Sequence, residues 1–438
     1  MKILHISTLE RSGGAARVAL RLCLAQRETG HDAQMLVGHK ESDAPYSHEL
    51  SYRIDVSLSE SCCHRGLLYY ELQGSHFLAV HQLVQDADVL HLHNLHGGYF
   101  NPFSLLLLGR LKPVVWTLHD MQALTGHCAH SFACERWKTG CAECANLEIY
   151  PQLEVDSARR LWDDKKIIYD HVPFHIISPS VWLGNKVKES ILGSHSLEII
   201  HNGVDTSVFK PYDKIESRRR LGLPVDAFIV GGVAHGGALK NSWKGGAYTL
   251  EALKVLFEEV EDSVYVGVGS PVSETDWNGR LINLAVVDSE EEMAWVYSAL
   301  DLYLMTSVAE NFPLVLLEAL ACGLPVLSFA TGGIPEIISN GVNGLIVEQR
   351  DLVEFCRGLL ALSLNRQLLK LFALNARDTA ITLFDHDKIA AKYEQSYCDY
   401  MSVWKTDRLR FSKIDQSMVP LEVSSEVFLK CLSMVNLS

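Results

Sequence analysis

Apolar and polar residues alternate along the chain in two successive series of short strands and helices. In the first series, an apolar run at residues 2–7 precedes a glycine-containing loop, and residues 17–29 carry apolar positions at helical spacing. Similar short apolar runs, typical of buried strands, follow at residues 33–37, 89–93, 114–118 and 175–178. This pattern predicts an α/β domain built on a parallel sheet.

The second series begins with an apolar strand at residues 228–233. A glycine-rich loop follows, and the pattern then predicts a helix at 248–258, a strand at 264–268, a helix at 290–300 and a strand at 302–305. The alternation continues to about residue 364. We therefore expect two doubly wound α/β domains that face each other across a ligand-binding cleft.

The expected domain limits follow from this pattern. The first domain covers residues 1–203, with a cysteine-rich insertion at about 126–146, and the second covers residues 204–385. A helix at 386–404 is expected to return to the first domain. The tail at 405–438 carries no motif that identifies a role.

Composition and charge agree with a globular enzyme. The 438 residues are 48% hydrophobic and 21% charged, and their net charge is -14. Non-specific nucleic-acid binding requires a basic surface, so this charge argues against nucleic acid as a partner. The longest apolar runs fall short of the roughly 20 residues that a membrane helix needs.

The first eight residues read as a strand and lack the apolar stretch of a signal peptide, so we expect a cytoplasmic protein. The eleven cysteines are then expected to be reduced thiols.

In open α/β sheets, ligands bind beyond the carboxyl ends of the parallel strands. The residues that follow each predicted strand are therefore candidate site residues. The residues selected in this way are Gly13, Gly14, His93, Asn94, His119, Asp120, Gly236, Gly237, Glu310, Gly332 and Gly333.

The segment 310–318 has the most informative chemistry. It predicts a loop and then a helix from Pro313 to Cys322, whose first free amides, those of Leu314 and Val315, would hold a diphosphate. Glu318 would accept the two ribose hydroxyls and Glu310 the hydroxyls of a sugar. Two ordinary surface carboxylates are the alternative, which the apolar surroundings disfavour.

Two lysines and a glycine pair add phosphate-binding candidates. Lys244 precedes a helix and would neutralise diphosphate charge, with Lys240 as a second candidate that is equally well explained as a surface residue. Gly13 and Gly14 allow close approach of the backbone to a phosphate or sugar, although a double glycine is often only a turn. The absence of Gly-x-Gly-x-x-Gly after the first strand excludes a nicotinamide site.

His119 at a strand end is either a site residue or a neighbour of backbone carbonyls, and the adjacent Asp120 favours a site. His91, His93 and His96 permit a metal site, but we favour a polar wall of the cleft.

Four cysteines fall within seventeen residues and suggest a structural zinc site: Cys128, Cys134, Cys141 and Cys144. The Cys141-x-x-Cys144 pair has zinc-ligand spacing, whereas the first two cysteines are separated by five intervening residues. Packed thiols and disulfides are the alternatives. Zinc would stabilise a lid on the acceptor side without entering the reaction.

These motifs together resemble the retaining glycosyltransferases of family 4, which have the GT-B fold of two facing Rossmann-like domains. The resemblance covers roughly residues 1–400 and rests on Ser12–Ala15, His119-Asp120, Asn202–Asp205 with Phe209, Lys244-Gly245, the 310–318 segment and Thr331–Glu336. It implies catalytic roles for His119, Asp120 and Glu310. It implies donor binding by Gly13, Gly14, Lys240, Lys244, Asn311, Phe312, Leu314, Val315 and Glu318. Family members commonly carry an arginine before the Lys-Gly pair, and here Lys240 stands in its place.

The resemblance implies transfer of a hexose from a nucleoside-diphosphate sugar to a saccharide acceptor, without a catalytic cofactor. The run from His119 to Cys128 and the later cysteines resemble the branch of colanic-acid-type transferases in exopolysaccharide synthesis. A lipid-linked acceptor and peripheral association with the inner membrane face are then expected. The alternatives are a non-catalytic nucleotide-sugar-binding protein and a nucleotide-sugar epimerase of similar fold.

Overall fold

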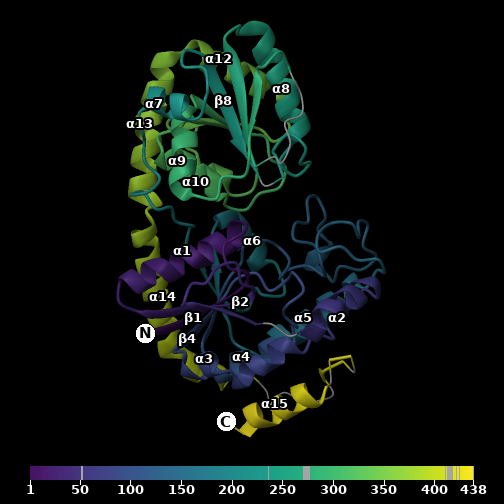
Figure 1. Cartoon of the computed structure of the whole chain (residues 1–438). Helices are drawn as coiled ribbons and strands as arrows, with labels where there is room; N and C mark the ends of the chain where they lie inside the picture. Colours follow the sequence, from purple (N-terminus) through teal and green to yellow (C-terminus); the bar gives the residue numbers. More distant parts are fainter. Residues whose placement is uncertain are drawn as a thin grey trace. The chain divides into compact units, whose positions relative to one another are not determined.

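The computed structural model of the chain describes all residues except 51–52, 235, 270–276, 410, 412–417, 421, 424 and 438. The side chains of residues 53–57 and 436–437 are also left undescribed. The chain divides into two compact units, each with a parallel sheet and helices (Figure 1). Unit 1 comprises Met1–Ile200 and Ala390–Ser438, and unit 2 comprises His201–Ile389. The predicted fold class of two α/β domains is confirmed.

Unit 1 is built on a seven-stranded parallel sheet with the order β3-β2-β1-β4-β5-β6-β7. Its strands are β1 (Lys2–Leu9), β2 (Asp32–His39), β3 (Ser47–Glu49), β4 (Val89–Leu92), β5 (Val114–Thr117), β6 (His175–Ser178) and β7 (Ser196–Ile199). Every residue of β4 and β5 is buried, as expected for central strands covered on both faces. The carboxyl ends of β1, β4 and β5 therefore lie next to one another at one edge.

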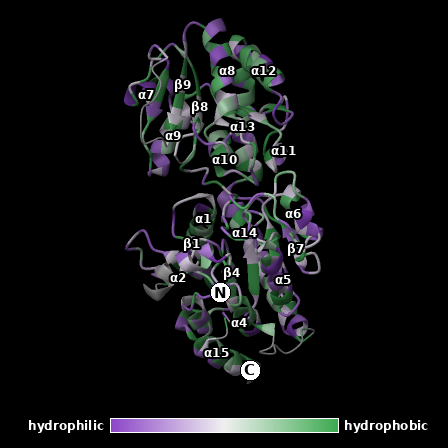
Figure 2. Cartoon of the chain, turned by 90° about the vertical axis from the view of Figure 1, so that its right-hand side faces the viewer, coloured by the Kyte–Doolittle hydropathy of each residue, from purple (hydrophilic) through white to green (hydrophobic). Residues whose placement is uncertain are grey.

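The helices of unit 1 connect these strands. They are α1 (Gly14–Glu28), α2 (Arg53–His64), η1 (Gly74–Val80), α3 (Gln82–Asp86), α4 (Ser104–Leu111), η2 (Arg136–Lys138), α5 (Ala158–Tyr169) and α6 (Val181–Lys188). Helix α4 contains four successive buried leucines and is coloured as hydrophobic in Figure 2. It belongs to the core of the unit.

Unit 2 contains a six-stranded parallel sheet with the order β10-β9-β8-β11-β12-β13. Its strands are β8 (Phe228–Val233), β9 (Ser263–Val268), β10 (Leu281–Leu284), β11 (Leu302–Met305), β12 (Val326–Phe329) and β13 (Gly344–Val347). Because β8, β11 and β12 are neighbours, the loops that follow them share one edge of the sheet.

The helices of unit 2 are α7 (Lys214–Arg220), α8 (Gly246–Glu259), α9 (Glu290–Ala299), α10 (Leu314–Ala321), α11 (Ile334–Ile337), α12 (Leu352–Leu364) and α13 (Arg366–Leu383). Helix α8 packs on α12, whereas α10 packs on α9 and α13 (Figure 1). Helix α10 is almost wholly apolar and buried, which matches its hydrophobic colour in Figure 2.

The last part of the chain returns to unit 1. Helix α14 (His386–Arg408) begins in unit 2, and its residues from Ala390 onward belong to unit 1. The buried Tyr393 and Tyr397 form hydrogen bonds with Thr117 and His91 of unit 1. Helix α15 (Glu426–Leu437) packs against η1 and α4, with Phe428 in the core.

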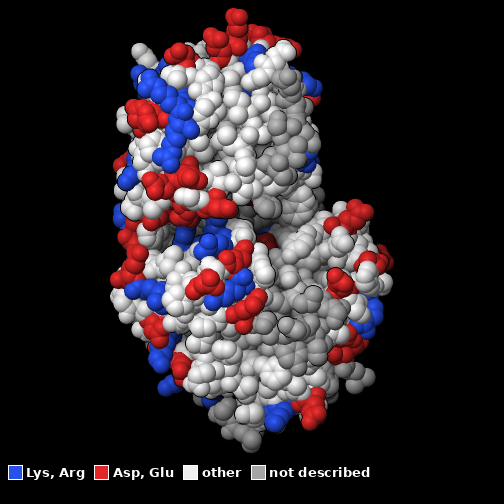
Figure 3. All heavy atoms as spheres, in the orientation of Figure 1, with Lys and Arg blue, Asp and Glu red and all other residues white. Residues whose placement is uncertain are grey.

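Two surface properties bear on partners. Within the described part of the chain, no helix combines the length and apolar character needed to cross a bilayer. On the face drawn in Figure 3, acidic and basic side chains are interspersed, and no broad basic area appears among the described residues. This face offers no extended surface for a phosphate backbone.

Candidate functional site

The start of helix α10 occupies the carboxyl edge of the unit 2 sheet. The helix begins at Leu314, with Pro313 at the N-cap, and ends at Ala321, one residue inside each predicted limit. Its first-turn amides, including those of Leu314 and Val315, have no partner within the helix. The proline fixes the backbone at this entry, and the helix dipole favours an anion there.

Glu310 and Lys244, which are 66 residues apart in sequence, meet at this edge. The Lys244 Nζ atom donates to Glu310 Oε1 at 2.6 Å. The Glu310 side chain is 9% exposed and that of Lys244 is 32% exposed, so the pair is accessible mainly through the lysine. Two of the predicted site residues are thus brought together as an ion pair.

Glycines allow the loops around this pair to approach closely. Gly245 has φ 68°, and a Cβ atom there would lie 1.9 Å from the Thr306 carbonyl oxygen. Gly332 has φ 59°, and its Cβ atom would lie 1.9 Å from the Glu310 carbonyl oxygen. Any side chain at either position would push apart the backbones that hold Lys244 and Glu310.

Glu318 lies on α10 and is only 1% exposed. Its Oε2 atom accepts a hydrogen bond of 3.0 Å from the hydroxyl of Tyr297 on α9. Burial, followed by the Glu318 charge, holds the pKa of Tyr297 well above its usual value, so this hydroxyl keeps its proton and remains a donor. Tyr297 was not predicted as a site residue, because nothing local in its helix pattern distinguishes it from a core tyrosine.

The other predicted donor-binding residues of unit 2 differ in their exposure. The Asn311 carbonyl accepts the Gly333 amide at 2.8 Å, which ties this loop to the loop after β12. Phe312 is buried and stacks on His201, with 4.7 Å between ring centroids. Lys240 is exposed. Direct contact of these three residues with a donor stays a prediction.

In unit 1, the glycine loop lies between β1 and α1. Gly13 has φ 88° and forms the N-cap of α1, a backbone conformation that favours glycine. The amides of Arg11 and Ser12 donate to Glu41 Oε2 at 2.8 and 2.9 Å. The Glu41 carboxylate already accepts hydrogen bonds from these two amides of the loop. A ligand would therefore bind at the start of α1, at Gly14.

His119 and Asp120 follow β5 at the same edge of the unit 1 sheet. They line a small cavity together with His93, Asn94 and His96. His96 Nε2 donates to Asp120 Oδ2 at 2.8 Å. Burial alone would raise the pKa of Asp120, but His96 and the Gln122 amide hold it below its usual value. The carboxylate is therefore an anion at neutral pH.

The histidines of β4 and of the loop after it do not all fit the predicted polar wall. His93 and His96 line the small cavity beside His119, and their place in a cleft wall stays a prediction. His91 is fully buried, and its ring nitrogens bond Thr117 Oγ1 and the Tyr397 hydroxyl, each at 2.7 Å. The prediction that His91 belongs to a polar wall of the cleft is wrong, because its side chain is buried in the layer between the sheet and α14.

All four cysteines of the insertion are free thiols. Cys144 Sγ lies 3.3 Å from His127 Nε2, and Cys141 Sγ accepts the Gly126 amide at 3.1 Å. In this fully described segment, no three metal-binding atoms lie within 4.8 Å of one another. Cys128, Cys134, Cys141 and Cys144 therefore do not form a preassembled zinc centre. Zinc binding stays a prediction, for which one bound zinc per purified chain would be the supporting result.

Two family models match the chain. The model described as Glycosyltransferase Family 4 matches residues 12–208, and the model described as Glycosyl transferases group 1 matches residues 232–365. The chain is a family 4 glycosyltransferase. The first match contains His119 and Asp120 of this glycosyltransferase, and the second contains Lys244, Glu310 and Glu318.

Named relatives are glycosyltransferases as well. The enzyme is 26% identical over 371 residues to the Escherichia coli (strain K12) protein WcaC, named as a colanic acid biosynthesis glycosyl transferase, covering 80% of this chain and 89% of WcaC. It is 31% identical over 217 residues to the D-inositol 3-phosphate glycosyltransferase of Mycolicibacterium smegmatis. That second match covers 47% of this chain and 48% of the relative.

Solved structures of similar fold confirm the GT-B architecture. HepE of Anabaena in complex with UDP has a TM-score of 0.63 and 18% identity, over 91% of this chain and 100% of HepE. Sucrose-phosphate synthase of Thermosynechococcus elongatus has a TM-score of 0.65 and 18% identity, over 92% of this chain and 100% of that chain. At these identities the similarity is one of fold.

Proposed function

We propose that this glycosyltransferase moves a hexose from a nucleoside-diphosphate sugar to a hydroxyl of a saccharide acceptor, with retention of anomeric configuration. The observation that carries the proposal is the grouping at one sheet edge of the α10 N-terminus, Glu318 on the same helix, and the Lys244–Glu310 pair at 2.6 Å. A helix start suits phosphates, and carboxylates suit the hydroxyls of ribose and sugar.

The phosphate part of the donor is assigned to α10 and Lys244. The amides of Leu314 and Val315 would hold the diphosphate, and the Lys244 ammonium would add a mobile positive charge. As the bond between the sugar C1 and the phosphate oxygen breaks, its electron pair moves to that oxygen. These groups stabilise the charge that develops on the leaving diphosphate, and the step needs no metal or cofactor.

The sugar part is assigned to carboxylates and a histidine. Glu310 would accept hydroxyl groups of the transferred ring, and His119 and Asp120 are the further residues proposed to act on that ring. The acceptor hydroxyl attacks C1 from the face that the diphosphate leaves, and its proton passes to the departing phosphate oxygen. Configuration is then retained without an enzyme nucleophile.

We further propose that the product belongs to an exopolysaccharide or another cell-surface polysaccharide. The support is WcaC, whose name places it in colanic acid biosynthesis and whose similarity spans most of both chains. A lipid-linked saccharide is the acceptor class proposed, with the enzyme associated peripherally with the membrane.

A thermal-shift screen of uridine, guanosine and adenosine diphosphate sugars tests donor binding, because a bound donor stabilises the folded state. UDP-glucose is the first probe, since a structure of HepE contains it. We expect one nucleotide class to raise the melting temperature and to release nucleoside diphosphate when an acceptor is added. Binding without turnover that is insensitive to Glu310→Ala would indicate a non-catalytic binding protein. Conversion of the sugar without release of the nucleotide would indicate an epimerase.

A further inference from the structure

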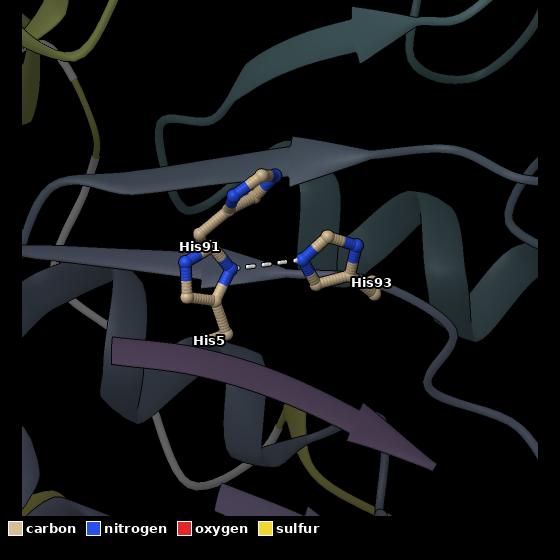
Figure 4. Close-up of side chains that lie close together, drawn as sticks. All are labelled: His5, His91 and His93. Atoms are coloured by element: carbon tan, nitrogen blue, oxygen red, sulfur yellow. Dashed lines mark hydrogen bonds between the residues drawn. The ribbon is translucent and has the colours of Figure 1, made fainter. Parts of the chain in front are cut away.

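A compact histidine cluster lies inside unit 1, beneath the edge that carries His119. His5 of β1 and His91 of β4 are 0% exposed, and His93, directly after β4, is 1% exposed. Figure 4 shows the three rings facing one another between their strands. Their nearest ring nitrogens all lie within 4.8 Å of one another, which is a spacing that a metal ion could use.

Hydrogen bonds account for these rings better than a metal does. Both nitrogens of each ring already have a partner. His5 bonds His93 at 3.1 Å and Gln26 at 2.8 Å. His91 bonds Thr117 and Tyr397, and the second nitrogen of His93 bonds His119 at 2.9 Å. A metal would have to displace several of these bonds in a dry interior, where unpaired polar groups are costly.

The direction of the bonds follows from the group at the buried end. Gln26 Oε1 is a carbonyl oxygen and can only accept, so His5 Nε2 carries a proton and donates. His5 Nδ1 then has a lone pair and accepts from His93 Nε2. By the same logic His93 Nδ1 accepts from His119 Nε2. The other side of Gln26 agrees, because its Nε2 donates to the Tyr397 hydroxyl at 3.2 Å.

Each of these histidine rings must be neutral, since an extra proton on a ring nitrogen would leave two hydrogen-bond donors facing each other. Burial lowers the pKa of His5 and His119 to about 4 and the pKa of His93 well below its usual value. For His119 the nearby Asp120 charge opposes this effect, and His96 adds to it. At neutral pH each ring therefore holds one proton.

We propose that His5 and His93 are positioning residues that hold the His119 ring in its Nε2–H form, so that its Nδ1 atom is a hydrogen-bond acceptor. If His119 acts on the transferred sugar, as in the proposed function on which this role rests, its Nδ1 atom accepts a hydrogen bond from a sugar hydroxyl, and the ring donates none to the sugar. His119 would then select a sugar that presents a hydrogen-bond-donating hydroxyl to its Nδ1 atom. The Gln26–His5–His93–His119 series is called the histidine chain below.

The test is nitrogen-15 NMR of the full-length protein labelled at histidine, because ring-nitrogen shifts distinguish the two neutral forms and the cation. In the wild type we expect His119 to be protonated at Nε2 only, from pH 6 to pH 8. His93→Leu removes the acceptor and should allow the Nδ1–H form or the cation to appear. His93→Asn places a side-chain oxygen near the lost Nδ1 atom and should restore the Nε2–H form.

His91→Gln is the matched control. His91 is equally buried and lies on β4, but it bonds Thr117 and Tyr397 and stands outside the histidine chain. This variant should leave the His119 spectrum unchanged. A wild-type His119 that is protonated at Nδ1 or doubly protonated at neutral pH would overturn the proposal, even if no variant folds. An unchanged His119 form in folded His93→Leu would overturn it as well.

A kinetic measurement separates this proposal from the proposed function. For the donor found by screening, His93→Leu should lower kcat/KM by about threefold to tenfold, the effect of one neutral hydrogen bond, and His93→Asn should recover most of it. If the wild type turns over no donor, the proposed function fails, while the NMR spectra still decide the state of His119. Equal activity of wild type and His93→Leu in the presence of turnover would contradict the role of the histidine chain in the reaction.

Discussion

At the scale of single residues, Glu318 is the carboxylate assigned to the donor ribose. We expect Glu318→Ala to weaken binding of the nucleoside diphosphate by about 1.5–3 kcal/mol, or roughly 10- to 150-fold, because charge-assisted hydrogen bonds are lost. Isothermal titration calorimetry measures this loss. Tyr297→Phe removes only the bond that orients Glu318 and should have a smaller effect. Unchanged affinity in Glu318→Ala would remove this residue from the site.

A variant of Lys244 can show whether this residue binds the phosphates of the donor or supports binding of its base and ribose. Lys244→Met removes the ammonium that pairs with Glu310 at 2.6 Å, and it should weaken binding of the nucleoside diphosphate while sparing the nucleoside. The difference should shrink as ionic strength rises, since the Lys244 side chain is partly exposed and its charge is screened. An equal loss for the nucleoside and its diphosphate would show that Lys244 supports the fold and does not contact phosphate.

At the scale of elements, hydrogen bonds of tyrosine hydroxyls hold helix α14 against the sheet of unit 1. The Tyr397 hydroxyl bonds His91 Nδ1 at 2.7 Å in a fully buried position. Tyr397→Phe leaves that nitrogen unpaired and should lower the free energy of unfolding by about 1–3 kcal/mol in urea titrations.

Tyr400 on the same helix is the control for this prediction. It is 4% exposed, and its buried hydroxyl has no hydrogen-bond partner among the described residues. Tyr400→Phe keeps the ring that stacks on His175 and should change the free energy of unfolding by less than about 0.5 kcal/mol. Equal losses for the two variants would mean that ring packing, and not the hydroxyl of Tyr397, fastens the helix.

The elements that could be predicted from sequence are those with a strong apolar period. Strands 228–233 and 302–305 were predicted at their observed limits, and α10 differs by one residue at each end. β3, β7 and β10 were not predicted. β3 has only three residues at the sheet edge, and β10 is partly exposed, so neither carries a long apolar run.

The candidate site was predictable where it depends on the ends of parallel strands. That rule selected Glu310, whereas Lys244 was predicted from its place before a helix, and the structure pairs the two. Partners contributed by distant elements were not predictable. Tyr297 and Gln26 lie within ordinary helix patterns, and only the folded structure brings them to Glu318 and His5. His91 was assigned to a polar wall of the cleft because its alternation with His93 does not reveal that α14 covers it.

At the scale of the whole molecule, buried neutral histidines make stability depend on pH. The pKa of His5 and His119 is about 4 because of burial, compared with about 6.5 in an unfolded chain. Between these values the unfolded state binds protons that the folded state does not, so stability is highest above about pH 6.5 and falls as pH decreases toward 4.

Urea unfolding at pH 7.5 and at pH 5.0 measures this effect over a range in which most carboxylates stay ionised. We expect a lower free energy of unfolding at pH 5.0, by several kcal/mol if more than one of these histidines contributes, since one pKa unit corresponds to about 1.4 kcal/mol. A free energy that stays constant or rises on acidification would show that the histidines take up protons without unfolding.

The central claim is that this family 4 glycosyltransferase transfers sugar from a nucleoside-diphosphate donor with retention. Proton NMR of the reaction with the donor selected by screening, UDP-glucose first, measures both transfer and anomeric configuration in one experiment. The account predicts release of nucleoside diphosphate together with a product whose new glycosidic bond keeps the configuration of the donor, and loss of both signals in Glu310→Ala. A product of inverted configuration, or a bound donor that is never consumed with any saccharide acceptor, would contradict it.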